Sequence, residues 1–164
     1  MKTLKFIGAT VIMIITALTL SYCHNDDDDD DNDSDVNLAM LPGTWISTNQ
    51  RGHENYGGEE DSWNDNYDPN NPTDGCTKIV ITNTSGNTFQ VKQYEYESSG
   101  WGTPASYSVT VTSNSFTMTQ GTETAKITFL QLNSTNMVIN RIASGTEDGI
   151  KFTSESETTY KKMN

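Results

Sequence analysis

The sequence lacks most of the residues on which catalytic and metal sites depend. Its 164 residues include two cysteines and two histidines, and one of these, His24, precedes an acidic run near the N-terminus. No serine stands at a strand-to-helix elbow, no Cys–His pair has a third member, and no glycine cluster joins a strand to a helix. We therefore expect no enzyme, no cofactor and no metal site. A hydrolase is disfavoured because no nucleophile and base can be paired.

Positive charge is also scarce. The chain has 10 lysines and arginines against 22 aspartates and glutamates, which gives a net charge of −12. Nucleic-acid binding requires a basic face that releases counterions, and adsorption to anionic lipid headgroups requires the same sign of charge. This composition argues against both kinds of partner.

A helical pattern is missing from the chain beyond residue 22, since no stretch of 11 residues repeats apolar positions at i, i+3, i+4 and i+7. Alternation of apolar and polar residues instead predicts eight strands. They span residues 43–49, 77–83, 87–97, 105–112, 115–120, 124–132, 136–142 and 150–161. Short links between them indicate an antiparallel meander, which removes its exposed edges by closing. The predicted fold is all-β, an eight-stranded antiparallel up-and-down barrel, with a β-sandwich as the alternative.

Two of the predicted strands change phase along their length. In the third strand the apolar positions shift between Val91 and Tyr94, and in the sixth they shift between Phe129 and Leu130. A one-residue slip of this kind is typical of a β-bulge, which also helps a sheet to curve. The pattern therefore predicts a bulge in each of these strands.

The chain begins with an apolar run over residues 6–20, preceded by two lysines. At about 1.5 Å per residue this run is shorter than the ~30 Å core of a membrane, so it is typical of a secretory signal peptide over residues 1–22. The alternative is a short uncleaved anchor helix. The motif Leu-Ser-Tyr-Cys at residues 20–23 resembles the lipobox of bacterial lipoproteins. That resemblance implies lipidation of Cys23 and anchoring of the mature protein to a membrane.

An acidic segment follows this cysteine. It contains an unbroken run of aspartates from Asp26 to Asp31, and like charges at this density repel one another. Residues 23–37 are therefore expected to be a disordered tether, ahead of one domain over residues 38–164. The run resembles the acidic signal that sends some Gram-negative lipoproteins to the cell surface. It implies a lipid-anchored outer-membrane protein on that surface, with a periplasm-facing anchor as the alternative.

Residues 50–76 have no strand pattern and are predicted to form one long loop, of the kind that is usually functional. The loop is rich in acids and amides, the ligand types of calcium, but their spacing does not fit an EF-hand. A solvated acidic loop is the preferred interpretation. Cys76 has no partner once Cys23 is lipidated, and burial is favoured over an intermolecular role.

The sequence Leu-Pro-Gly-Thr-Trp at residues 41–45 resembles the Gly-x-Trp motif that opens a lipocalin, and residues 126–139 and 160–162 are similar to the late strands of bacterial lipocalin-like domains. The resemblance implies a barrel whose closed end contains Gly43 and Trp45, with a cavity for one small ligand. It also implies that the long loop over residues 50–76 covers the open end of the barrel.

In lipocalins, the tryptophan at the closed end stacks with an arginine late in the chain. Here no arginine follows Arg141. The resemblance therefore implies that Lys161 or Lys162 makes a weaker cation–π contact with Trp45 in its place.

Our leading functional hypothesis is a monomeric, membrane-anchored lipoprotein that binds a small apolar ligand in the barrel cavity. The residues expected to line this cavity are Ile79, Ile81, Val109, Val111, Phe116, Met118, Ile127 and Phe129. The alternative is a surface module that binds a glycan or a partner protein through Trp63, Tyr67 and Trp101. Aromatic rings suit both uses, because their faces cover apolar C–H surface while polar groups remain hydrated.

Overall fold

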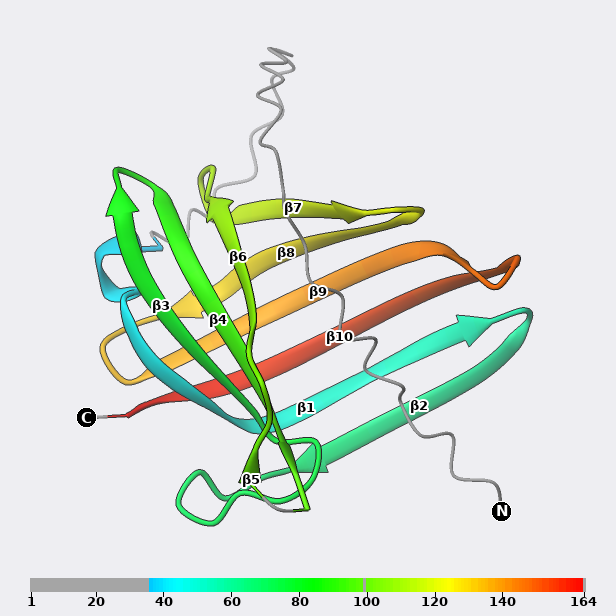
Figure 1. The fold of residues 1–164 in the computed structure, drawn as a ribbon, viewed down its shortest axis with the longest axis horizontal. Helices are drawn as coiled ribbons and strands as arrows, with labels where there is room; N and C mark the ends of the chain where they lie inside the picture. Colours follow the sequence, from blue (N-terminus) through cyan, green and yellow to red (C-terminus); the bar gives the residue numbers. More distant parts are fainter. Residues whose placement is uncertain (1–35, 99, 164) are drawn as a thin grey trace.

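The computed structural model describes residues 36–98 and 100–163, which form one curled antiparallel sheet and a single short 3₁₀ helix, η1 (Leu38–Met40) (Figure 1). The predicted signal peptide, the lipidation of Cys23 and most of the tether lie outside these residues. Within the described part of the chain, no helix has the length and apolar character needed to cross a membrane.

The sheet contains ten strands: β1 (Gly43–Tyr56), β2 (Glu59–Asn66), β3 (Thr77–Ser85), β4 (Thr88–Glu97), β5 (Gly100–Trp101), β6 (Ala105–Thr110), β7 (Ser115–Gln120), β8 (Glu123–Leu132), β9 (Asn136–Glu147) and β10 (Ile150–Met163). Eight of them follow one another around the sheet in the order β6, β4, β3, β1, β10, β9, β8, β7. These eight are the strands that the alternation predicts, and all their pairings are antiparallel. The all-β up-and-down fold is thus confirmed, and the chain forms one curled sheet rather than the two packed sheets of a sandwich.

The sheet curls into a barrel wall but is not closed. Its two ends are β6 and β7, which follow each other in the chain; β6 pairs with β4, and β7 pairs with β8. Among the described residues, only an isolated bridge between Thr112 and Ser115 joins the two ends, at the turn where Ser113 adopts a positive φ of 55°. In Figure 1, β3, β4 and β6 run steeply across the long strands β8, β9 and β10, and β7 diverges from β6.

The prediction of one long loop over residues 50–76 is wrong. β1 continues to Tyr56 and turns through Gly57 and Gly58, both with positive φ, into β2, which pairs with it. The second half of β1 also pairs with β10, so this hairpin extends the sheet beyond the barrel wall. The strand pattern is missing from the sequence because β2 is polar and largely exposed on both faces, while backbone hydrogen bonds hold the strand in place.

The two predicted bulges have different outcomes. The register of β8 against β9 shifts between Phe129 and Gln131, which confirms the bulge in the sixth predicted strand. The bulge predicted in the third strand is wrong, because β4 pairs with β3 without interruption from Phe89 to Glu95. Tyr94 lies instead on the outer face of the sheet, where the Lys78 Nζ atom is 4.3 Å from the centre of its ring. An outward aromatic ring, rather than an extra residue, accounts for the change of phase.

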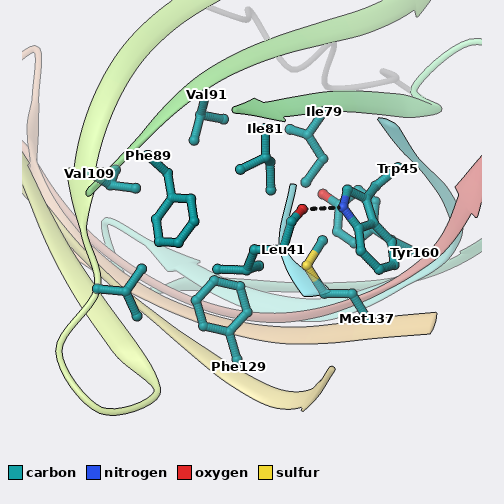
Figure 2. Close-up of a cluster of buried hydrophobic side chains, with 11 residues drawn as sticks. Leu41, Trp45, Ile79, Ile81, Phe89, Val91, Val109, Phe129, Met137 and Tyr160 are labelled. Carbon is teal, nitrogen blue, oxygen red and sulfur yellow. Dashed lines mark hydrogen bonds between the residues drawn. The ribbon is translucent and has the colours of Figure 1, made fainter. Parts of the chain in front are cut away.

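The closed end of the barrel is packed around Trp45, which is fully buried. Its indole Nε1 donates a hydrogen bond of 2.8 Å to the carbonyl oxygen of Leu41, and Met137 and Tyr160 complete the cluster (Figure 2). Because a buried indole N–H needs an acceptor, this bond fixes the orientation of the ring. The segment around η1 thus plugs one end of the barrel.

Lys162 also contacts the closed end of the barrel. Its Nζ atom lies 4.9 Å from the centre of the Trp45 ring and donates a 2.8 Å hydrogen bond to the carbonyl oxygen of Met40. The expected lysine–tryptophan contact is therefore confirmed, for Lys162. Gly43 makes the approach possible: its φ is +140°, and a Cβ atom there would lie 2.6 Å from the Lys162 Cε atom.

Cys76 is a free, fully buried thiol, as expected for an unpaired cysteine beside a strand. Its Sγ atom lies 3.5 Å from the hydroxyl oxygen of Ser47. Burial raises the pKa of the thiol, so the side chain is held in its neutral and less reactive form.

Candidate functional site

The inner face of the sheet encloses a cavity of about 170 Å³. All eight residues that the sequence predicts for the barrel interior line this cavity: Ile79, Ile81, Val109, Val111, Phe116, Met118, Ile127 and Phe129. They come from β3, β6, β7 and β8, where alternation sends every second side chain inward, and Val111 continues that alternation just past the end of β6. The structure thus brings these residues together around one space, while their role in binding a ligand stays a prediction.

The deep part of the cavity is apolar and adjoins the closed end. Leu41, Met137 and Tyr160 belong both to the cavity wall and to the buried core around Trp45. Drug-sized ligands usually occupy pockets of roughly 300–1,000 Å³, whereas an apolar cavity of roughly 150 Å³ accepts benzene. The enclosed space therefore suits one compact apolar group rather than an entire large ligand.

The mouth of the cavity is polar. Tyr107 of β6 and Gln93 of β4 line it, and the Tyr107 hydroxyl donates a 3.1 Å hydrogen bond to Gln93 Oε1. Burial raises the pKa of the Tyr107 phenol far above its ordinary value, so this hydroxyl stays protonated in neutral solution and remains a donor. The two side chains form a neutral polar edge on one wall.

Arg141 of β9 lies on the opposite wall and also lines the cavity. Its Nη2 atom is 2.6 Å from Glu123 Oε1, and its Nη1 atom donates a 3.3 Å hydrogen bond to Ser154 Oγ. The Arg141 side chain is 37% exposed, so the guanidinium is held in place while part of it still faces solvent. Such a group is suited to bind an anionic or strongly polar group of a ligand at the mouth.

Sequence reasoning missed Arg141 as a site residue, although a signal was present. Met137, Ile139 and Arg141 occupy alternate positions of one predicted strand, so they share a face. All three line the cavity. The alternation therefore indicates an inward-facing arginine at position 141.

Trp101, one of the three aromatic residues of the alternative hypothesis, lies on the outer face of the sheet. Its ring meets that of Tyr96 edge-on, with centroids 5.2 Å apart, and Lys78 Nζ lies 4.4 Å from the Trp101 ring centre. Desolvation lowers the pKa of this lysine. Lys78 is thus held between the rings of Trp101 and Tyr94.

The other two aromatic residues lie elsewhere. Trp63 is in the middle of β2, and its ring covers Gly52. The Tyr67 hydroxyl lies close to Gly75, where a Cβ atom added to this glycine would be 3.1 Å from the hydroxyl oxygen. Burial, reinforced by the negative charge of Asp65, raises the pKa of Tyr67 to about 12. The three rings therefore occupy three settings and do not form one continuous loop surface.

A second hollow, of about 490 Å³, lies along the projecting part of the sheet and is polar. Its side chains come from β1, β2, β9 and β10 and include Arg51, His53, Asn64, Asn140, Glu155 and Glu157. Arg51 is paired with Glu157 at 2.7 Å, and the Asn140 amide donates to Glu155 at 3.0 Å. Within the described residues, no three acidic, histidine or cysteine side chains are grouped so that they could hold a metal ion.

No protein-family model and no curated protein sequence matches this chain. Among solved structures, it is similar to the S-type phycobiliprotein lyase CPES from Guillardia theta, with 7% sequence identity and a TM-score of 0.50, over 77% of this chain and 90% of that chain. It is also similar to the siderocalin Ex-FABP, with 12% identity and a TM-score of 0.48, over 76% and 74%. At these identities the likeness concerns the fold alone. The likeness to the lyase structure agrees with the strand order in showing an all-β, up-and-down antiparallel sheet of the barrel type.

Proposed function

We propose that this domain binds a small, mainly apolar molecule that carries one polar or anionic group. The observation behind the proposal is the composition of the cavity, which is apolar at the closed end and has Arg141 and Tyr107 at its mouth. A compact apolar group enters the deep part, while the polar group stays at the mouth.

Binding without catalysis is the second part of the proposal. None of the described residues that line the cavity is an acid, a histidine or a cysteine. Burial raises the pKa of the phenols of Tyr107 and Tyr160, so both stay protonated in neutral solution and neither is available as a base. With this lining, retention or transport of a ligand suits the cavity better than turnover.

The third part concerns location. We propose that the mature protein begins at Cys23, is anchored through lipid on that residue and stands at the outer surface of a bacterial outer membrane as a monomer. The basis is the sequence of residues 1–35, with its lysines, apolar run, lipobox-like motif and aspartate run. Mass spectrometry of the protein from its source cells tests the anchor. Acylation and loss of residues 1–22 support it, whereas an intact N-terminus contradicts it.

The ligand is best sought first without assuming its identity. Native mass spectrometry of the protein taken from its source cells would reveal a non-covalent adduct of a few hundred daltons, lost on denaturation. Titration with the fluorescent apolar amine N-phenyl-1-naphthylamine then measures whether the purified protein takes up an apolar molecule.

Two matched variants of β8 locate the binding of this probe. Ile127 lines the cavity, whereas Leu130 is 45% exposed on the same strand. Ile127→Phe fills cavity space and is expected to weaken binding at least tenfold, while Leu130→Phe leaves it unchanged. Equal affinities in the two variants would place the probe outside the cavity and refute the proposed site.

A further inference from the structure

The pairing of β2 places Trp63 on the face of the sheet that forms the cavity. In one cross-strand row, Trp63 lies opposite Gly52, Gly52 opposite Ser156, and Ser156 opposite Arg141. Directly opposite residues in antiparallel strands project from the same face. Since Ser156 and Arg141 line the cavity, the tryptophan belongs to the same inner surface, just beyond the mouth.

Gly52 leaves the room that the indole occupies. A Cβ atom at this position would lie 2.5 Å from the Glu155 carbonyl oxygen, 2.6 Å from Trp63 Cζ2 and 2.9 Å from the Ser156 Cβ atom. The indole of β2 therefore lies over Gly52 of β1, on the side where the Ser156 side chain of β10 also lies. Any side chain at position 52 would displace the indole from this position.

The small volume of the cavity explains how a ligand would come to contact the Trp63 ring. With about 170 Å³ enclosed, a ligand of ordinary size must extend past the mouth. Along the row of Ser156 it would pass between the half-buried Trp63 on one side and the guanidinium of Arg141 on the other. Ser156 lies between them and has a small side chain. A flat segment of the ligand could therefore lie on the sheet there, between the Trp63 indole and the Arg141 guanidinium.

We propose that Trp63 determines ligand specificity by covering the part of the ligand that protrudes from the cavity. This inference rests on the proposed function and narrows the ligand class to molecules with a flat apolar segment longer than the enclosed space. An aromatic ring lying over a glycine also supports a sheet in the absence of any ligand. The two roles differ in one respect: only the proposed role makes the effect of Trp63 depend on ligand length.

Two probes of different length separate these roles. Naphthalene has one fused ring system, and N-phenyl-1-naphthylamine carries the same system with an added phenylamino group. In the full mature protein, Trp63→Ala is expected to weaken binding of the longer probe about three- to tenfold, the usual worth of one aromatic contact, and to leave naphthalene unaffected. Trp63→Phe should retain most of the affinity for the longer probe.

Two further variants serve as controls. Trp63→Leu keeps an apolar side chain over Gly52 but removes the planar ring, and it should reproduce the length-dependent loss. Tyr94→Ala removes a half-buried ring from the outer face and should change the affinity of neither probe. Because Trp63→Leu still covers Gly52 with an apolar side chain, it keeps the test valid if Trp63→Ala fails to fold.

The outcomes distinguish this inference from the proposed function. If the wild-type protein binds the longer probe and the Trp63→Ala and Trp63→Leu variants bind it equally well, the inference is overturned while the cavity site stands. The same holds if the variants lose both probes to the same extent. If the wild-type protein binds neither probe, the proposed function itself fails, and the role of Trp63 fails with it.

Discussion

The two ends of this barrel are built in opposite ways. At the closed end, Trp45 and Met137 are fully buried, and the indole both donates a hydrogen bond to Leu41 and contacts the Lys162 ammonium group. At the open end, Arg141 and Trp63 are partly exposed and lie beside small residues. The closed end is held by several contacts at once, whereas the open end keeps large planar side chains accessible.

This contrast separates stability from binding within one sheet. Dense packing leaves little space and fixes one arrangement of side chains, so a change there affects the fold. At the open end, the projecting hairpin of β1 and β2 is held by its backbone ladder and by exposed polar contacts such as that of Arg51 with Glu157, and it buries little apolar surface. We therefore expect substitutions at the closed end to change the free energy of unfolding, and substitutions at the open end to change ligand affinity.

The largest effect is expected at Trp45. Replacement of this buried indole by alanine leaves a large void and removes the hydrogen bond to Leu41, at a cost of about 3–5 kcal/mol in the free energy of unfolding. Urea denaturation measures the loss. Trp101→Ala, on the outer face, should cost about 1 kcal/mol or less. Similar losses in the two variants would contradict the contrast between core and surface tryptophans.

Two methionines of the cavity wall allow a comparison without a change of residue type. Met137 is fully buried at the closed end, and Met118 is only partly buried on β7, at one edge of the sheet. Met137→Ala is expected to lower the free energy of unfolding by about 2–4 kcal/mol, and Met118→Ala by about 1 kcal/mol. Thermal unfolding of both variants checks the order. A greater loss of stability from Met118→Ala than from Met137→Ala would contradict the expectation that the closed end contributes more to the free energy of unfolding.

A smaller effect is expected at Lys162. Lys162→Met removes the cation from the Trp45 ring and the hydrogen bond to the Met40 carbonyl, and should lower stability by about 1 kcal/mol. Lys161→Met is the matched control, because Lys161 is exposed and adjacent in the chain. If the denaturation midpoints fall equally in both variants, the contacts of Lys162 with Trp45 and Met40 add nothing to the effect of removing one positive charge.

The smallest effect concerns Tyr67, which follows the projecting hairpin. Its pKa is raised to about 12 in the folded protein, from an ordinary value of about 10. The unfolded chain therefore loses this proton first as the pH rises, and the stability associated with the neutral phenol is lost between pH 10 and 12. Tyr67→Phe should reduce the loss of stability over this window, measured by denaturant titrations at several pH values. An unchanged alkaline profile would assign the loss to other tyrosines.

Much of the fold could be predicted from the sequence because the eight barrel strands each bury one face. Burial forces alternation, and alternation is visible along the chain, as at Ile79 and Ile81 or Ile127 and Phe129. The same signal located the apolar half of the cavity. β2 gave no such signal, since both of its faces are polar and its position depends on pairing with β1 rather than on burial.

The mouth of the cavity could not be assembled from the sequence for a related reason. The proximity of Trp63 to Ser156 depends on the register of three strands and on the missing side chain of Gly52. Neither feature leaves a periodic pattern. The inward position of Arg141 can be predicted from its alternation with Met137 and Ile139. Its ion pair with Glu123 cannot, because that contact depends on the register of β8 against β9.

The open seam between β6 and β7 has a mechanical consequence. A fully closed barrel has a girth fixed by its number of strands and their stagger, because every strand is bonded on both sides. Among the residues that the structure describes, backbone pairing joins the two edges only at the turn around Ser113. A separation of β6 from β7 would break no bond of the ladders that hold β6 to β4 and β7 to β8. The circumference of this barrel is therefore set at the seam by the packing of Val109 and Val111 with Phe116 and Met118, rather than by strand pairing.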